Sequence, residues 1–186
     1  MSFKVKVRNK PGPSIVAAQE FAMAKHGQQD HGCLKIGDHL LDVAKHVCLH
    51  YDDNVNIGTL EDVVCAAWLH DVVEDTDVCS DEIHEKFGER VGTIVDLVTD
   101  KSGRNRLERH LKTYHMIRRD PDALLVKLCD RRHNQERSIK HGEHYAAMYE
   151  KEYIYFKFAL WTPHLFEGLW GELDSQYVML RGMLKW

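Results

Sequence analysis

Residues 60–76 read LEDVVCAAWLHDVVEDT, and this stretch decides the fold. Its first half is almost entirely apolar, and Leu60, Val63, Val64 and Ala67 recur at the i, i+3, i+4 and i+7 spacing of one helix face. Such spacing predicts a buried helix over about residues 59–73. An imidazole and three carboxylates then gather at its carboxyl end: His70, Asp71, Glu74 and Asp75.

Helical spacing continues on both sides of this stretch. The four prolines stand at positions 11, 13, 121 and 163, so no helix-breaking ring interrupts residues 14–120. We expect an all-α helical bundle in a single domain over residues 1–186. Its helices are predicted at about 14–27, 39–51, 59–73, 80–87, 89–99, 104–119, 121–137, 143–160 and 165–182, with Ser14, Thr59 and Ser80 as helix N-caps.

Evidence for strands is confined to the start of the chain. Only residues 3–8, FKVKVR, alternate cleanly between apolar and polar side chains, and one strand without a partner makes no sheet. Chain ends are usually loosely held, so residues 1–12 are predicted to form a mobile arm.

Composition excludes several classes of protein. The 186 residues are 44% hydrophobic and 29% charged, which is typical of a folded globular domain rather than a disordered or fibrous chain. No apolar run reaches the roughly 18 residues of a membrane span, and the first residues lack the apolar segment of a secretion signal. Five cysteines without close pairing indicate reduced thiols, so we expect a cytoplasmic protein without membrane contact.

Positive charge is concentrated in one segment. Residues 101–140 carry twelve Lys or Arg against five Asp or Glu, whereas the remaining chain carries 13 against 24. The segment is either a solvated helix face or a wall that binds phosphate groups. An acidic body disfavours an extended nucleic acid, so the expected partner is a small anionic molecule.

The acidic cluster after residue 69 suggests a metal centre. Buried carboxylates are costly unless they are paired or bound to a cation. His39 and Asp130 also stand at the polar ends of apolar runs, and with His70 and Asp71 they supply two imidazoles and two carboxylates. This mixed set suits Mn²⁺, Fe²⁺ or Co²⁺ with open coordination positions better than a closed tetrahedral zinc site.

The order of these motifs resembles a known family. HDVVEDT at 70–76, EIHEKFGERVGTIVDLVTD at 82–100 and VKLCDRRHN at 126–134 are similar to the hydrolase domain of Rel/SpoT-type alarmone enzymes, within the HD superfamily of metal-dependent phosphohydrolases. The resemblance covers about residues 17–138. It implies an all-α HD fold that binds Mn²⁺ and removes pyrophosphate from the 3′ position of guanosine tetra- or pentaphosphate.

The resemblance also implies roles for individual residues. His39, His70, Asp71 and Asp130 match the metal ligands, and Glu74 and Asp75 match the acidic pair that positions and activates the attacking water. It also implies substrate contacts by Asn134, Lys101 and Arg109. Lys127 and Arg131 are expected to contact the substrate because their charge would offset that of its phosphates.

The sequence departs from the family where the base is bound. Gln28 matches the Gly-Gln element of the family, but Asp30 stands in place of a stacking arginine and Ile36 in place of a tyrosine. These changes favour an alternative reading, an HD-type phosphatase or nucleotidase acting on another nucleotide. A third reading is a catalytically silent nucleotide-binding protein, and a homo-oligomer is possible under each of the three.

Overall fold

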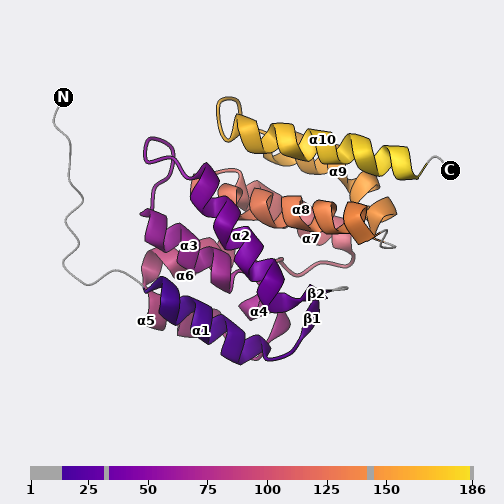
Figure 1. The fold of residues 1–186 in the computed structure, drawn as a ribbon. Helices are drawn as coiled ribbons and strands as arrows, with labels where there is room; N and C mark the ends of the chain where they lie inside the picture. The colour runs from indigo at the N-terminus through magenta and orange to yellow at the C-terminus, as the bar shows by residue number, and fades with distance from the viewer. Residues whose placement is uncertain (1–13, 32–33, 142–144, 185–186) are drawn as a thin grey trace, which may run out of the picture.

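Helices form nearly all of the regular structure (Figure 1). The computed structural model describes residues 14–31, 34–141 and 145–184. The predicted strand at 3–8 and the whole of the predicted arm lie outside these residues. The elements are α1 Ile15–His26, β1 Asp30–His31, β2 Leu34–Lys35, α2 Ile36–His50, α3 Leu60–Leu69, α4 Val72–Asp75, α5 Ser80–Phe87, α6 Glu89–Val98, α7 Arg106–Ile117, α8 Pro121–His141, α9 Ala146–Leu160 and α10 Glu167–Met183. The all-α prediction is confirmed.

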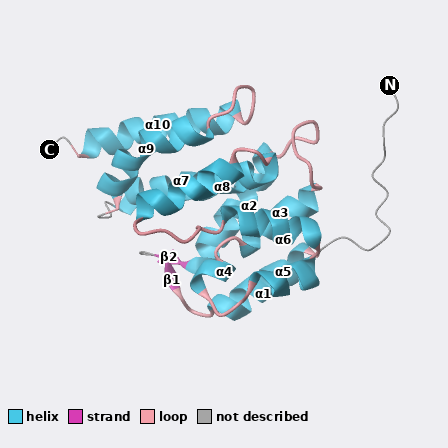
Figure 2. Ribbon diagram, turned by 180° about the vertical axis from the view of Figure 1, so that it is seen from behind, coloured by secondary structure: helices cyan, strands magenta, loops and turns pink. Residues whose placement is uncertain are grey.

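The helices pack in two groups around α8. Helices α1 to α6 lie on one side of the molecule, and α9 and α10 cover the other, as Figures 1 and 2 show. Helix α8 contacts α2 and α6 on one side and α10 on the other. One cluster of buried apolar side chains extends from α1 to α10. Within it, every residue of α3 from Val63 to Leu69 is at most 4% exposed, as its apolar sequence predicts. No described helix has both the length and the apolar character needed to cross a bilayer.

The helix predicted over residues 59–73 is interrupted. Helix α3 ends at Leu69, and the short helix α4 begins at Val72. His70 Nδ1 lies 2.8 Å from the carbonyl oxygen of Ala67, which is the acceptor that the Asp71 N–H would use in a continuous helix. The side chain of His70 therefore replaces a backbone partner at the point where the chain leaves α3.

Two of the three predicted N-caps are confirmed. The Ser14 hydroxyl accepts from the N–H of Ala17, and Thr59 forms a reciprocal capping box with Asp62. The prediction for Ser80 is wrong, because Cys79 occupies the cap position of α5. The Ser80 hydroxyl instead donates a very short hydrogen bond to Asp96 of α6. Helix α2 also begins three residues earlier than predicted, which places His39 inside the helix rather than at its start.

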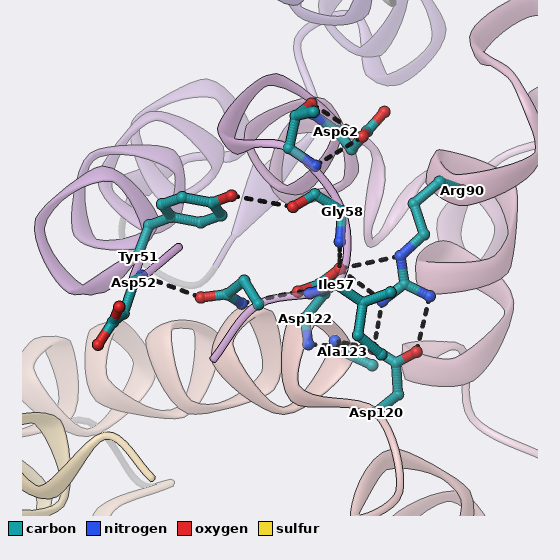
Figure 3. Close-up of polar contacts among 11 residues, drawn as sticks. Tyr51, Asp52, Ile57, Gly58, Asp62, Arg90, Asp120, Asp122 and Ala123 are labelled. Atoms are coloured by element: carbon teal, nitrogen blue, oxygen red, sulfur yellow. Dashed lines mark hydrogen bonds and ion pairs between the residues drawn. The ribbon is translucent and has the colours of Figure 1, made fainter. Parts of the chain in front are cut away.

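A buried carboxylate fastens the loop between α2 and α3 to the start of α8 (Figure 3). Asp122 is fully buried, and its two oxygens accept from the side chain of Asn56, the backbone N–H groups of Ile57 and Gly58, and the guanidinium of Arg90. Arg90 also donates two hydrogen bonds of 2.7 Å to Asp120. This network joins the α2–α3 loop, α6 and the start of α8.

Candidate metal centre and active site

Three separate segments bring the four predicted ligands together. His39 comes from α2, His70 and Asp71 from the break after α3, and Asp130 from α8. The Nε2 atoms of the two histidines are 3.2 Å apart. Asp71 places one oxygen 3.3 Å from His39 Nε2 and the other 3.2 Å from His70 Nε2. Asp130 Oδ1 lies 3.6 Å from the first nitrogen and 3.9 Å from the second.

The donor atoms fit a divalent cation. The Ala67 carbonyl can only accept a hydrogen bond, so His70 Nδ1 carries the proton and Nε2 presents its lone pair to the cluster. A backbone carbonyl behind a ligating imidazole is the arrangement that fixes the tautomer in metal sites. Two imidazole nitrogens and two carboxylates at these separations therefore form a preorganised N/O set for a divalent metal.

Burial sets the charge of these groups. His39 is fully buried, and this loss of hydration lowers its pKa to about 4, so the imidazole is neutral near pH 7. Burial alone would raise the pKa of Asp130, but Lys127 Nζ lies 3.0 Å from its Oδ2 and holds that pKa well below the usual range. The pKa of Asp71 is likewise lowered, against the effect of burial, by His70 and His39. Neutral imidazoles and ionised carboxylates are the forms that bind metal.

A second layer of side chains holds the ligands in place. Asn134 donates from Nδ2 to Asp130 Oδ1 at 2.5 Å, and its own oxygen lies 3.0 Å from His31 Nε2. The ring of His31 stacks on His39 with centroids 4.1 Å apart, and His133 packs edge-on against the other side at 4.7 Å. Asn134, predicted as a substrate contact, therefore lies next to a candidate ligand.

The two candidate catalytic acids lie on α4, beside the cluster. Glu74 is exposed, and its Oε1 accepts a hydrogen bond of 2.6 Å from the backbone N–H of Asp100. Partial removal from water raises the pKa of Glu74, and Asp71 adds to this effect. The pKa of Asp75 is also raised, mainly by partial removal from water and to a smaller extent by the charge of Asp71. Glu74 is thus anchored through one oxygen, while the other remains for a proton.

Two of the predicted phosphate-binding residues line a small cavity against Asp130. The cavity measures about 40 Å³, and Lys127 and Arg131 share it with Arg106 and His110. Arg131 is buried, pairs with Glu152 at 3.1 Å and lies over the rings of two aromatic residues of α9, Tyr149 and Phe156. Its Nη1 has no hydrogen-bond partner among the described residues. This buried N–H group is therefore an unsatisfied hydrogen-bond donor.

The other two predicted phosphate contacts lie elsewhere. Lys101 Nζ donates to the carbonyl oxygen of Asp96 at the end of α6. Arg109, on α7, is 3.7 Å from the carboxylate of Asp100. Neither residue lines the cavity of Lys127 and Arg131. Arg109 nevertheless lies near the active site, because the backbone of Asp100 holds Glu74.

The basic segment is largely paired within the protein. Arg132 contacts the carboxylates of Asp42, Glu136 and Glu172, and only 12% of its side chain is exposed. With Arg131 paired to Glu152, these two arginines form intramolecular ion pairs. The reading of a uniformly solvated basic face is therefore wrong for this part of α8.

The positions that depart from the family pattern differ in their exposure. Asp30 is exposed in the β1–β2 hairpin, and its carboxylate lies 2.5 Å from Lys35 Nζ. Ile36 is 1% exposed in the hydrophobic core, so it lines no base pocket. The expectation that both positions contact the base is wrong for Ile36.

Sequence reasoning missed two histidines of the centre. His133 follows Asp130 by three positions in α8, and this spacing places both on one helix face. Its Nδ1 lies 3.0 Å from Asp42, which follows His39 by three positions in α2. These spacings could have found His133 and Asp42. His31 reaches the site through the hairpin, for which the local sequence pattern gives no signal.

The bundle and its buried two-histidine, two-carboxylate centre define a helical metal-binding domain, and comparisons with known proteins assign its family. A model of the HD domain family matches residues 17–160, which is more than half of the chain. The chain therefore belongs to the HD domain family.

Several relatives of this chain are named as hydrolases. The guanosine-3′,5′-bis(diphosphate) 3′-pyrophosphohydrolase of Aquifex aeolicus is 36% identical over 124 residues, which is 64% of this chain and 17% of that protein. Human MESH1, named for the same activity, is also 36% identical, over 64% of this chain and 66% of its own. MESH1 of Xenopus tropicalis is 34% identical over 84% of this chain and 85% of its own. The first two alignments thus span less than two thirds of the relatives.

A solved structure has the same fold. It is described as a metazoan orthologue of SpoT that hydrolyses ppGpp. The two structures superpose with a TM-score of 0.72 at 25% identity, over 95% of this chain and all of the other.

Proposed function

We propose that this chain is a metal-dependent phosphohydrolase that removes the 3′-pyrophosphate of guanosine 3′,5′-bis(diphosphate). The observation that carries the proposal is the convergence of His39, His70, Asp71 and Asp130 beside a cavity lined by Lys127 and Arg131. Relatives that cover most of this chain are named for that reaction, which supports the choice of substrate.

The proposed metal ion is Mn²⁺, held by His39, His70, Asp71 and Asp130. When bound, a divalent ion lowers the pKa of a coordinated water and polarises a phosphoryl oxygen. The mixed nitrogen and oxygen set leaves the choice among Mn²⁺, Fe²⁺ and Co²⁺ to activity measurements. We further propose that residues 1–186 act as one domain and that the protein works in the cytoplasm, since its four described cysteines are free thiols.

The protein groups supply proton transfer and charge. Glu74 accepts the proton of the attacking water through the oxygen that does not bind the Asp100 N–H. Asp75, adjacent on α4, orients that water. A raised pKa suits Glu74 to this role, because a base whose pKa lies closer to the working pH also returns a proton to the leaving group more readily.

The basic groups offset the negative charge of the substrate. Lys127 carries a raised pKa because Asp130 and Glu74 stabilise its charge against the effect of burial, so it stays cationic. The unpartnered Nη1 of Arg131 donates to a phosphoryl oxygen in the cavity. Arg109 and Lys101, outside the cavity, contact the outer phosphates or the 5′-diphosphate.

A second candidate is an HD-type phosphatase or nucleotidase acting on another nucleotide. Asp30 favours it, because a carboxylate paired with Lys35 cannot provide the stacking cation expected over guanine. Such a cation is worth about 0.5–2 kcal/mol, which corresponds to about 30-fold at most. If guanosine 3′,5′-bis(diphosphate) is the substrate, we expect only a weak preference for guanine.

A substrate panel with Mn²⁺ separates the two candidates. The guanosine and adenosine 3′-pyrophosphates and simple nucleoside monophosphates are assayed in parallel for pyrophosphate and orthophosphate. Pyrophosphate release, with kcat/KM for guanine within about 30-fold of that for adenine, supports the proposal. Orthophosphate release from a monophosphate alone would assign the second candidate. A guanine preference above a hundredfold would show that residues other than Asp30 recognise the base.

A further inference from the structure

A second group of metal-ligating side chains lies on the surface between α2 and α10. His46 and His50 are four residues apart in α2, and therefore project from the same face of the helix. Glu172 of α10 lies opposite these two histidines and contacts His50. Each of the three residues offers one ligand atom, and all three atoms lie within 4.8 Å of one another.

One pair of these ligand atoms has the spacing found in a coordination shell, and the third atom lies within 4.8 Å of both. His50 Nε2 lies 3.3 Å from Glu172 Oε1. With metal–ligand distances of about 2.0–2.2 Å, neighbouring ligands of a tetrahedral zinc ion lie about 3.3–3.6 Å apart. His46 Nδ1 is buried and has no hydrogen-bond partner among the residues that the structure describes. This orphaned nitrogen belongs to the same group of three side chains.

Neighbouring charges orient the group and leave its ligand atoms available. Arg132 donates from Nε to Glu172 Oε2 at 2.7 Å, which leaves Oε1 directed at His50. Asp42 lies one turn before His46 on α2, with its Oδ1 3.9 Å from His46 Nε2. At this separation Asp42 lies beside the imidazole as a charge and forms no hydrogen bond to it.

This group is distinct from the HD centre. His46 follows His39 by seven residues, so the two lie about 10 Å apart along the axis of α2. The three residues are part-exposed, with 15%, 19% and 41% of the side chains of His46, His50 and Glu172 accessible. An ion from solution can therefore reach them without passing through the buried centre.

We propose that His46, His50 and Glu172 form a second metal site, for zinc, that clamps the end of α2 to α10. Two histidines and one glutamate are the protein ligands of a common type of open zinc site, with water in the remaining position. Nitrogen-rich sets bind zinc more tightly than Mn²⁺, which is the weakest binder of the first-row series. The clamp joins two helices whose ends lie next to each other in Figure 1.

Zinc stoichiometry tests the proposal. Chelator-treated protein of residues 1–186 is dialysed against buffered Zn²⁺, and its bound zinc is measured by elemental analysis. The variants are His50→Gln and Glu172→Gln, with His115→Gln as the matched control, because His115 is an exposed histidine of α7 outside both groups. We expect two zinc ions per chain in the unmodified protein and in His115→Gln, and one in the other two variants. Equal zinc content in all four proteins would overturn the proposal.

Thermal stability gives a second readout that is independent of the HD centre. The measurement uses His70→Gln protein, in which that centre is disabled, with circular dichroism to establish folding. At a zinc concentration near one hundred times Kd, the clamp is expected to raise Tm by about 5–10 °C. In the double variant with His50→Gln we expect no increase in Tm, and in the double variant with His115→Gln we expect the same increase. An unchanged increase after His50→Gln would show that zinc stabilises the protein elsewhere.

Discussion

The two ring nitrogens of His70 have separate partners, one in the backbone of α3 and one in the candidate metal centre. Nδ1 donates a hydrogen bond to the Ala67 carbonyl at the end of α3, and Nε2 faces His39 and Asp71 in the centre. One proton on one nitrogen therefore sets both the helix end and the direction of a ligand lone pair. The sequence shows that a histidine stands at the end of an apolar helix, but the break itself depends on this side-chain bond.

Glu74 is the residue on which proton transfer depends. Glu74→Gln keeps the shape of the side chain but cannot accept the proton, so kcat is expected to fall by about 10²–10⁴-fold while bound Mn²⁺ stays stoichiometric. Steady-state kinetics and metal analysis on the same preparation check this. Glu85→Gln, at an exposed position of α5, is the control and should be unaffected. Turnover near the unmodified rate with full metal content would assign the base to another residue.

The raised pKa of Glu74 predicts how kcat/KM depends on pH. Since the pKa of Glu74 is raised, the deprotonated form needed for catalysis is lost at a higher pH than for an ordinary glutamate. We expect kcat/KM at saturating Mn²⁺ to decline on lowering the pH, with an apparent pKa above that of an ordinary glutamate. In Glu74→Gln the residual rate should lack this acidic limb. A limb of the same midpoint in both proteins would exclude Glu74 as its origin.

At the scale of elements, Asp122 determines how α8 meets the rest of the bundle. Its oxygens accept hydrogen bonds from donors in the α2–α3 loop and in α6, as Figure 3 shows. In Asp122→Asn, an amide nitrogen replaces an acceptor that faces at least two N–H donors. We expect a loss of about 2–4 kcal/mol in the free energy of unfolding, and a decrease in Tm of about 5–15 °C.

Chemical denaturation of Asp122→Asn and of a control checks that expectation. Asp77→Asn is the matched control, because 90% of the Asp77 side chain is exposed, and its change should stay within about 0.5 kcal/mol. Equal stability of the two variants would mean that the buried network does not fasten the α2–α3 loop.

Across the whole molecule, helical periodicity predicted most of the elements, because each helix buries one apolar stripe in a common core. The four candidate ligands were also predictable, since His39, His70, Asp71 and Asp130 each stand where an apolar helix turns polar. The contact of His31 with His39 and the pairing of Arg131 with Glu152 were not predictable. His31 reaches His39 through a hairpin of two-residue strands, and Arg131 is committed to Glu152 of α9, a partner 21 residues away in sequence. Such contacts depend on tertiary packing rather than on local pattern.

The packing around α8 explains why one helix matters for both stability and chemistry. Its first turn carries Asp122 in the buried network, and its middle carries Lys127 and Asp130 in the candidate centre. Asp122 makes no contact with the candidate metal ligands. A substitution at this position is therefore expected to reduce metal binding only by unfolding the protein.

The most direct test of the central claim is metal-dependent release of pyrophosphate from guanosine 3′,5′-bis(diphosphate). Chelator-treated protein, the same protein reloaded with Mn²⁺, and Asp130→Asn with added Mn²⁺ are compared for metal content and products. The account predicts pyrophosphate and guanosine 5′-diphosphate in equal amounts from the reloaded protein alone, with metal content reduced in Asp130→Asn. Undiminished hydrolysis by the chelated protein or by Asp130→Asn would contradict it.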